Sequence, residues 1–169
     1  MGKGRVRNIR LISGLVLFAF VTTHFLNHSL GNISLAAMEA GREVFIAVWR
    51  NWPATIVLYG AMLLHILMAL WALWQRRTLR MSIAEGFQAV LALSIPFLLP
   101  AHILATRGGH EFFGVNDSHL YEIIGVWVWS PQNGWILAAA LLVVWSHGCI
   151  GMHLWLRLRP WCAGPAPGC

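Results

Sequence analysis

Residues 134–157 have the sequence GWILAAALLVVWSHGCIGMHLWLR, an apolar stretch that ends in an arginine. About 20 helical residues at roughly 1.5 Å each cover a hydrocarbon core of about 30 Å, so this stretch is long enough to cross a bilayer. His147 lies near its middle, well inside the predicted span. An ionisable side chain at that depth is costly in lipid and indicates a function.

The composition of the whole chain is that of a membrane protein. Of its 169 residues, 58% are hydrophobic and only 11% are charged, which is too apolar for an ordinary soluble domain. The net charge of +6 does not favour a nucleic-acid partner, because the basic residues gather at the ends of apolar stretches and form no single stripe. The three cysteines have neither the spacing of a metal site nor the even number of a disulfide framework.

Four membrane spans are predicted, at residues 9–30, 53–74, 82–106 and 134–157. Pro53 can begin the second span at its first helical position, and Pro96 and Pro100 should bend the third. Short interfacial helices are expected at residues 36–50 and 119–129. The predicted fold class is therefore an all-α membrane protein, a four-span transmembrane helical bundle with short interfacial helices.

The distribution of basic residues predicts the orientation. Only three of the twelve Lys and Arg residues, Arg42, Arg50 and Arg107, lie on the side opposite the N-terminal segment, so both termini are expected in the cytoplasm. The first apolar run is too long for a signal peptide and contains His24, which favours a retained helix. The expected organisation is a transmembrane domain over 1–160 and a cytoplasmic tail or linker over 161–169.

Each predicted span carries one deep histidine: His24, His65, His102 and His147. Counted from the cytoplasmic boundaries, His65 and His147 lie at about 15 Å, and His24 and His102 at about 21 to 25 Å. Two pairs at two levels suit two haem groups, each iron held by imidazoles from opposing helices. The alternatives are hydrogen bonds across helices, a proton relay or metal transport, although the last two usually also use deep Asp, Glu or Cys.

Four further polar residues lie near these levels: His28, Arg107, His153 and Arg157. A quinone headgroup needs polar groups at the membrane interface beside a haem, which makes His28 and His153 candidate contacts. His153 and the two arginines equally suit pairing with haem propionates. His110 and His119 are expected to be solvated loop residues.

Short motifs along nearly the whole chain resemble the dihaem cytochrome b anchor of succinate dehydrogenases and fumarate reductases. They are Arg10–Gly14 (RLISG), His24–Asn27 (HFLN), His65, Gln88, residues 102–107 (HILATR), His147, Gly151 and Trp155. The resemblance implies two haem b groups, with His24 and His102 as axial ligands of the outer one and His65 and His147 as those of the inner one. The segments TTHFLNH and WSHGCIGMHLWLRL are still more similar to the version at the N-terminus of bacterial class III adenylate cyclases.

The resemblance implies a redox- or quinone-responsive sensor in the bacterial inner membrane that anchors a cytoplasmic cyclase domain. The alternative is an electron-transfer anchor subunit with flavoprotein and iron–sulfur partners. Ile12 stands where the dehydrogenase anchors have a histidine, which favours the sensor. The further span usual in this family is missing after Pro160, so an incomplete or shortened bundle is expected. The expected partners are the lipid bilayer, a quinone and one of these cytoplasmic components; a homodimer is left open. No catalytic constellation is present, so no autonomous enzyme activity is expected.

Overall fold

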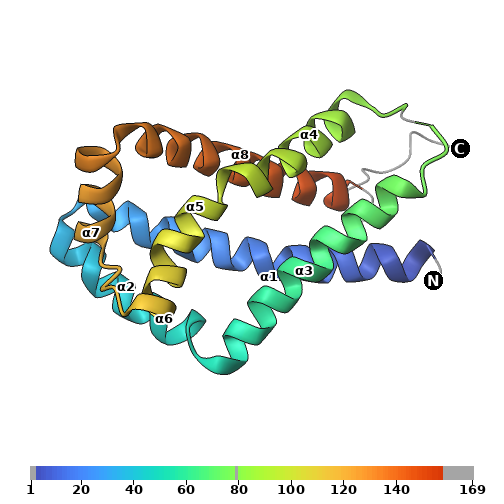
Figure 1. Ribbon diagram of the computed structural model, residues 1–169. Helices are drawn as coiled ribbons and strands as arrows, with labels where there is room; N and C mark the ends of the chain where they lie inside the picture. The colour runs from blue at the N-terminus through green and yellow to red at the C-terminus, as the bar shows by residue number, and fades with distance from the viewer. Residues whose placement is uncertain (1–2, 79, 158–169) are drawn as a thin grey trace, which may run out of the picture. The chain divides into compact units, whose positions relative to one another are not determined.

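The computed structural model describes residues 3–78 and 80–157, which form helices joined by short turns (Figure 1). No strand occurs among these residues, which confirms the predicted all-α class. In chain order the helices are α1 (Lys3–Ser29), η1 (Leu30–Asn32), α2 (Leu35–Trp49), α3 (Trp52–Trp74), α4 (Ile83–Leu98), α5 (Pro100–Ile103), η2 (Leu104–Gly108), α6 (Gly109–Phe113), α7 (His119–Ile123), η3 (Ile124–Trp129) and α8 (Pro131–Leu156). The predicted tail over 161–169, and with it the domain boundary after residue 160, lies outside the described residues.

Three of these helical segments are long and apolar enough to cross a membrane: Gly4–Asn32, Trp52–Trp74 and Pro131–Leu156. A fourth candidate consists of Ile83–Leu98 and Pro100–Phe113, two helices that meet at a bend of 40°. Pro96 lies inside α4 and Pro100 begins α5, so the bend falls where the two prolines predicted it. The described residues therefore contain three membrane spans, or four if the bent pair is one span, and the chain is a membrane protein whose environment is a lipid bilayer.

Local sequence explains where the spans begin. The side chain of Asn51 accepts a hydrogen bond from the Ala54 amide at 2.9 Å and caps α3, with Pro53 in its first turn. Ser82 and Glu85 form a reciprocal capping box at the start of α4. Helix α8 begins at Pro131, three residues before the predicted start of its span, because proline is well tolerated in the first turn of a helix.

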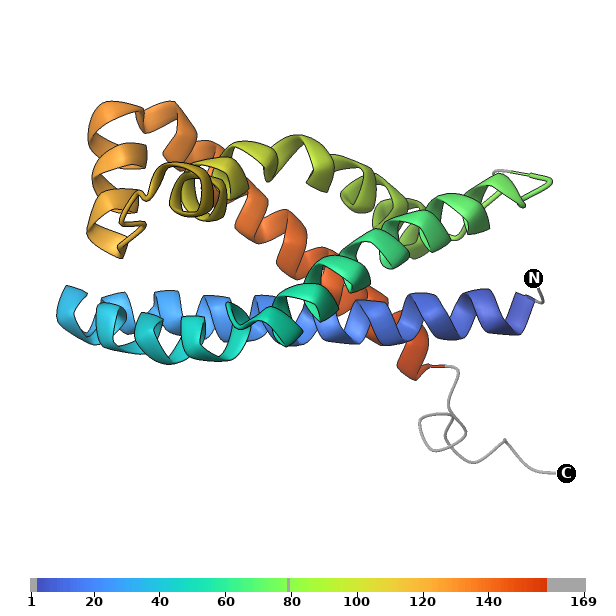
Figure 2. The same cartoon turned by 60° about the horizontal axis from the view of Figure 1, so that its bottom comes forward.

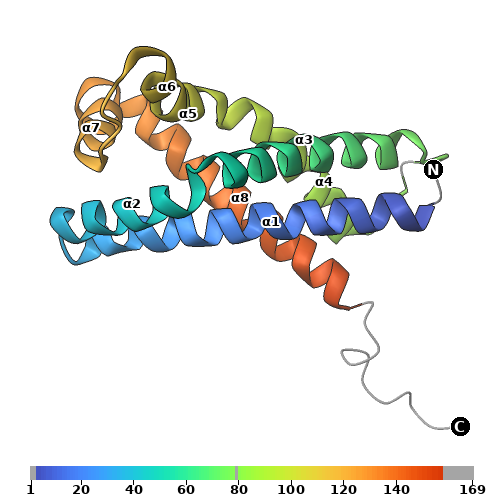
Figure 3. The same ribbon diagram turned by 90° about the horizontal axis from the view of Figure 1, so that it is seen from below.

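The described residues divide into two compact units. Unit 1 contains the residues up to 78 together with Ser118–Tyr121, and unit 2 contains 80–117 and 122–157. In unit 1, α2 and α3 follow each other along the length of α1 (Figures 2 and 3). Helix α2 packs on the C-terminal half of α1, where Trp49 donates its indole N–H to the Thr23 hydroxyl at 3.0 Å. Helix α3, which carries His65, packs on the N-terminal half of α1, and α1 itself carries His24. Two of the predicted haem ligands therefore lie on or beside α1.

In unit 2, α4 packs against α8, and the segment between them folds into short helices. Helix α6 ends at Gly114, whose φ of 65° lies in the left-handed region that glycine adopts without strain. The predicted helix over 119–129 is confirmed as α7 followed by the π-helical stretch η3. Trp127 of η3 packs on Gly134 and on the Trp135 ring, with 5.7 Å between the two indole centroids.

Candidate functional site

His65 of α3 is held by the backbone of α1 in unit 1. Its ring nitrogen Nδ1 donates a hydrogen bond to the carbonyl oxygen of Arg10, with 3.0 Å between the two atoms. The hydroxyl oxygen of Ser13 lies 3.3 Å from the same nitrogen and offers a second acceptor. Ser13 is itself buried and donates its hydroxyl proton to the carbonyl of Ile9 at 2.8 Å. The imidazole is therefore oriented by two groups on one turn of α1.

This hydrogen bond has a consequence for the other ring nitrogen. A carbonyl oxygen can only accept, so Nδ1 must carry the proton. In a neutral imidazole of this tautomer, Nε2 carries the lone pair and is the nitrogen that can bind a metal. Metal-ligating histidines usually donate their second ring N–H to a carbonyl or carboxylate in this way. The two acceptors beside His65 Nδ1 therefore suit an imidazole that would bind a haem iron through Nε2.

His24 lies nearer the C-terminal end of α1, in a cluster of aromatic rings. The Phe20 ring stacks on it with 5.7 Å between centroids and 8° between planes, and the Phe45 ring of α2 lies 5.4 Å away. Its Nε2 is 3.2 Å from Nε2 of His28, so one of these two imidazoles donates to the other. His24 and His28 therefore lie on the same face of α1 and present their ring nitrogens to the same space.

His119 belongs to this cluster, which the sequence did not predict. It was expected to be a solvated loop residue, but it is only 4% exposed, so that expectation is wrong. The buried Asn27 side chain donates to His119 Nε2 at 2.8 Å, and the rings of His28 and His119 lie 4.9 Å apart. The Leu120 amide, next in α7, donates to a carboxylate oxygen of Glu39 on α2 at 3.3 Å. These long-range contacts bury His119 in unit 1.

The two predicted ligands of unit 1 lie at different heights along α1. His65 is opposite Arg10, Ser13 and Gly14, and His24 follows ten residues after Gly14. At 1.5 Å per residue the two levels are about 15 Å apart. The depth count from the sequence gave a smaller separation of about 6 to 10 Å, because it placed His65 without knowing how α3 is aligned with α1. His24 and His65 therefore still lie at two separate levels along α1.

In unit 2, the two predicted ligands lie on different helices, His102 on α5 and His147 on α8. His147 is four residues before Gly151 of α8, where an added Cβ would be 3.0 Å from the Gln88 amide nitrogen of α4. Glycine at 151 therefore allows close packing of α4 on α8 beside His147. His102 lies in α5, after the bend at the prolines, and the π-helical stretch η2 begins two residues later. Short π-helical stretches inside helices are frequent at functional sites.

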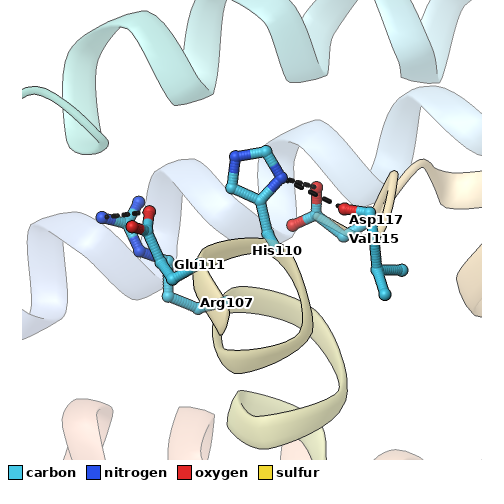
Figure 4. Close-up of polar contacts among 5 residues, drawn as sticks. All are labelled: Arg107, His110, Glu111, Val115 and Asp117. Carbon is cyan, nitrogen blue, oxygen red and sulfur yellow. Dashed lines mark hydrogen bonds and ion pairs between the residues drawn. The ribbon is translucent and has the colours of Figure 1, made fainter. Parts of the chain in front are cut away.

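The remaining predicted contacts have varied surroundings. Arg107 Nη2 forms an ion pair with Glu111 Oε1 at 3.0 Å, a partner that the sequence analysis did not assign (Figure 4). Nearby, His110 Nδ1 donates to the Val115 carbonyl at 3.1 Å and lies 3.8 Å from Oδ1 of the buried Asp117. The side chains of His153 and Arg157, at the end of α8, are exposed.

The structure therefore brings His24, His28 and His119 together at one level of α1, and places His65 about 15 Å away at another. The members of each predicted axial pair belong to different units, so both pairs remain predictions. No protein-family model, curated protein or solved structure matches this chain.

Proposed function

We propose that this chain is a dihaem b cytochrome module of a bacterial inner membrane, with both termini in the cytoplasm. Its axial ligands are His24 with His102 and His65 with His147. The observation that carries the proposal is the hydrogen bond from His65 Nδ1 to the Arg10 carbonyl, because it orients the imidazole and fixes the proton on Nδ1, the tautomer typical of metal-ligating histidines. Haem bound there supplies reversible one-electron chemistry.

The proposed role is that of a redox- or quinone-responsive sensor that anchors a cytoplasmic cyclase-type domain. Helix α8 supports this role, because it runs without a break from Pro131 through His147 to Leu156. A change in packing at His147 can thus move along one rigid helix toward the end of the chain. An electron-transfer anchor instead needs a flavoprotein and an iron–sulfur subunit docked beside it. The coding sequence that follows, and the neighbouring genes, distinguish these two roles.

For the quinone, we propose a site next to His24 with His28 as the polar contact. His28 lies between His24 and the buried His119, so its imidazole is positioned and close to the outer ligand. His153, Arg107 and Arg157 are the further candidates, the arginines as partners of propionates. Quinol should reduce the haems more slowly in His28→Ala, with full haem content. Equal rates in wild type, His28→Ala and His153→Ala would remove both histidines from the quinone site.

The cofactor is tested by purifying the protein from haem-sufficient cells and recording redox difference spectra with the haem-to-protein ratio. Wild type should contain two low-spin haems per chain, and His65→Ala should contain one. His28→Ala is the matched control, a histidine in the same unit that should leave both haems in place. If His65→Ala keeps two haems, His65 is not an axial ligand.

A further inference from the structure

We infer that Gly14 is the positioning residue for the inner haem. Because position 14 has no side chain, the His65 imidazole can lie against α1 and reach the Arg10 carbonyl. The inference rests on the proposed function and names a residue that acts on iron only through His65. An added Cβ at position 14 would lie 2.9 Å from His65 Cε1 and 3.2 Å from Nδ1. Both atoms belong to the edge of the ring that faces α1.

The direction of the missing side chain matters. Cβ atoms of an α-helix tilt toward its N-terminus, so a side chain at 14 would lie over the preceding turn, which contains the Arg10 carbonyl. That oxygen also lies in the α1 backbone ladder, and its second lone pair is available to His65 Nδ1 at 3.0 Å. Glycine at 14 therefore keeps this carbonyl accessible from the side of α3.

Alanine at this position would act through the ring. Carbon atoms pack best at about 3.5 to 4.0 Å, so the imidazole would have to move by roughly 0.5 to 1 Å. Moving away from α1 lengthens the bond to the Arg10 carbonyl and the 3.3 Å approach to the Ser13 hydroxyl. The imidazole then no longer has a single tautomer, and the lone pair on Nε2 no longer points in a fixed direction. Outer-shell partners of this kind typically change metal affinity about 10- to 100-fold.

Ser13 makes a smaller contribution to the positioning of the His65 imidazole. Its hydroxyl is the second acceptor near Nδ1, but the closer acceptor is a backbone carbonyl that no side-chain substitution removes. Ser13→Ala should therefore retain both haems and change only the midpoint potential of the inner one. Less hydrogen bonding to the ligating imidazole reduces its donor strength and raises that potential.

The experiment compares Gly14→Ala with Gly60→Ala. An added Cβ at Gly60, on α3 five residues before His65, meets no described atom within 4 Å outside its own stretch of helix. Gly14→Ala should lower the haem-to-protein ratio from about two to about one, with the outer haem unchanged. Gly60→Ala should keep both haems. Retention of the outer haem shows that the Gly14→Ala protein is folded.

A second readout is independent of haem loading. Nitrogen-15 NMR of histidine-labelled protein, prepared without haem, should show His65 protonated at Nδ1 in wild type and in Gly60→Ala, and a tautomer mixture in Gly14→Ala. The inference is overturned if Gly14→Ala matches Gly60→Ala in haem content, inner-haem potential and His65 tautomer. If wild type binds no haem, or His65→Ala keeps two, the proposed function fails first and the role of Gly14 fails with it.

Discussion

Replacing Gly41 by alanine should loosen the contact between α1 and α2. An added Cβ at 41 would overlap the Asn27 amide oxygen and approach Leu30 Cδ1 to 2.5 Å. Overpacking of this kind costs about 1 to 3 kcal/mol. Displacing Asn27 also disrupts its hydrogen bond to His119, which contributes about 0.5 to 1.5 kcal/mol more. Measured against an alanine substitution that meets open space, the expected loss is therefore about 1.5 to 4.5 kcal/mol of unfolding free energy.

The assay is denaturant unfolding of the purified protein in detergent micelles, followed by circular dichroism. Gly60→Ala is the control, because its added methyl group meets open space. Alanine is also the better helix former by about 1 kcal/mol, so the control should be as stable as wild type or slightly more stable. A Gly41→Ala protein as stable as the control would refute the close packing of α2 on Asn27.

Three further predictions concern single contacts. Ser82→Ala removes the capping box of α4 and should cost about 1 kcal/mol, seen as faster amide exchange in its first turn; unchanged exchange would contradict this. Gly134→Ala brings a Cβ within 2.7 Å of the Trp127 ring, so the tryptophan emission should shift and stability fall by about 1 to 3 kcal/mol, and an unaltered spectrum would argue against that contact. Glu111→Gln removes the ion pair with Arg107 at a half-exposed position, so thermal melts should change by less than about 0.5 kcal/mol; a larger loss would mean that the pair is part of a network.

The helices were largely predictable, because they depend on local properties of the sequence. The length of each apolar stretch defines a span, and Pro53, Pro96 and Pro100 determine where helices begin or bend. The start of α8 was missed by three residues, since polar residues after Pro131 hid a helical first turn. Pro131 itself, a residue favoured at the first position of a helix, was the available signal.

The surroundings of the histidines were less predictable, because they depend on contacts between distant residues. Nothing near His119 in the sequence indicates burial, and its hydrogen bond to Asn27 joins residues 92 positions apart. The alignment of α3 with α1 likewise decides that His65 meets the Arg10 carbonyl. The RLISG motif carries a weak signal for that contact, since Gly14 permits close approach, but only the packed helices show which ring occupies the space.

We propose that deep histidines of this membrane protein hold two haem groups. The most direct measurement is the reduced-minus-oxidised spectrum of purified, haem-sufficient wild-type protein, with haem quantified against protein. The proposed ligand set predicts two low-spin b-type haems per chain, both with bis-histidine electron paramagnetic resonance signals. A preparation with no haem absorbance would contradict the claim and leave the histidines as hydrogen-bonding groups of a helical bundle.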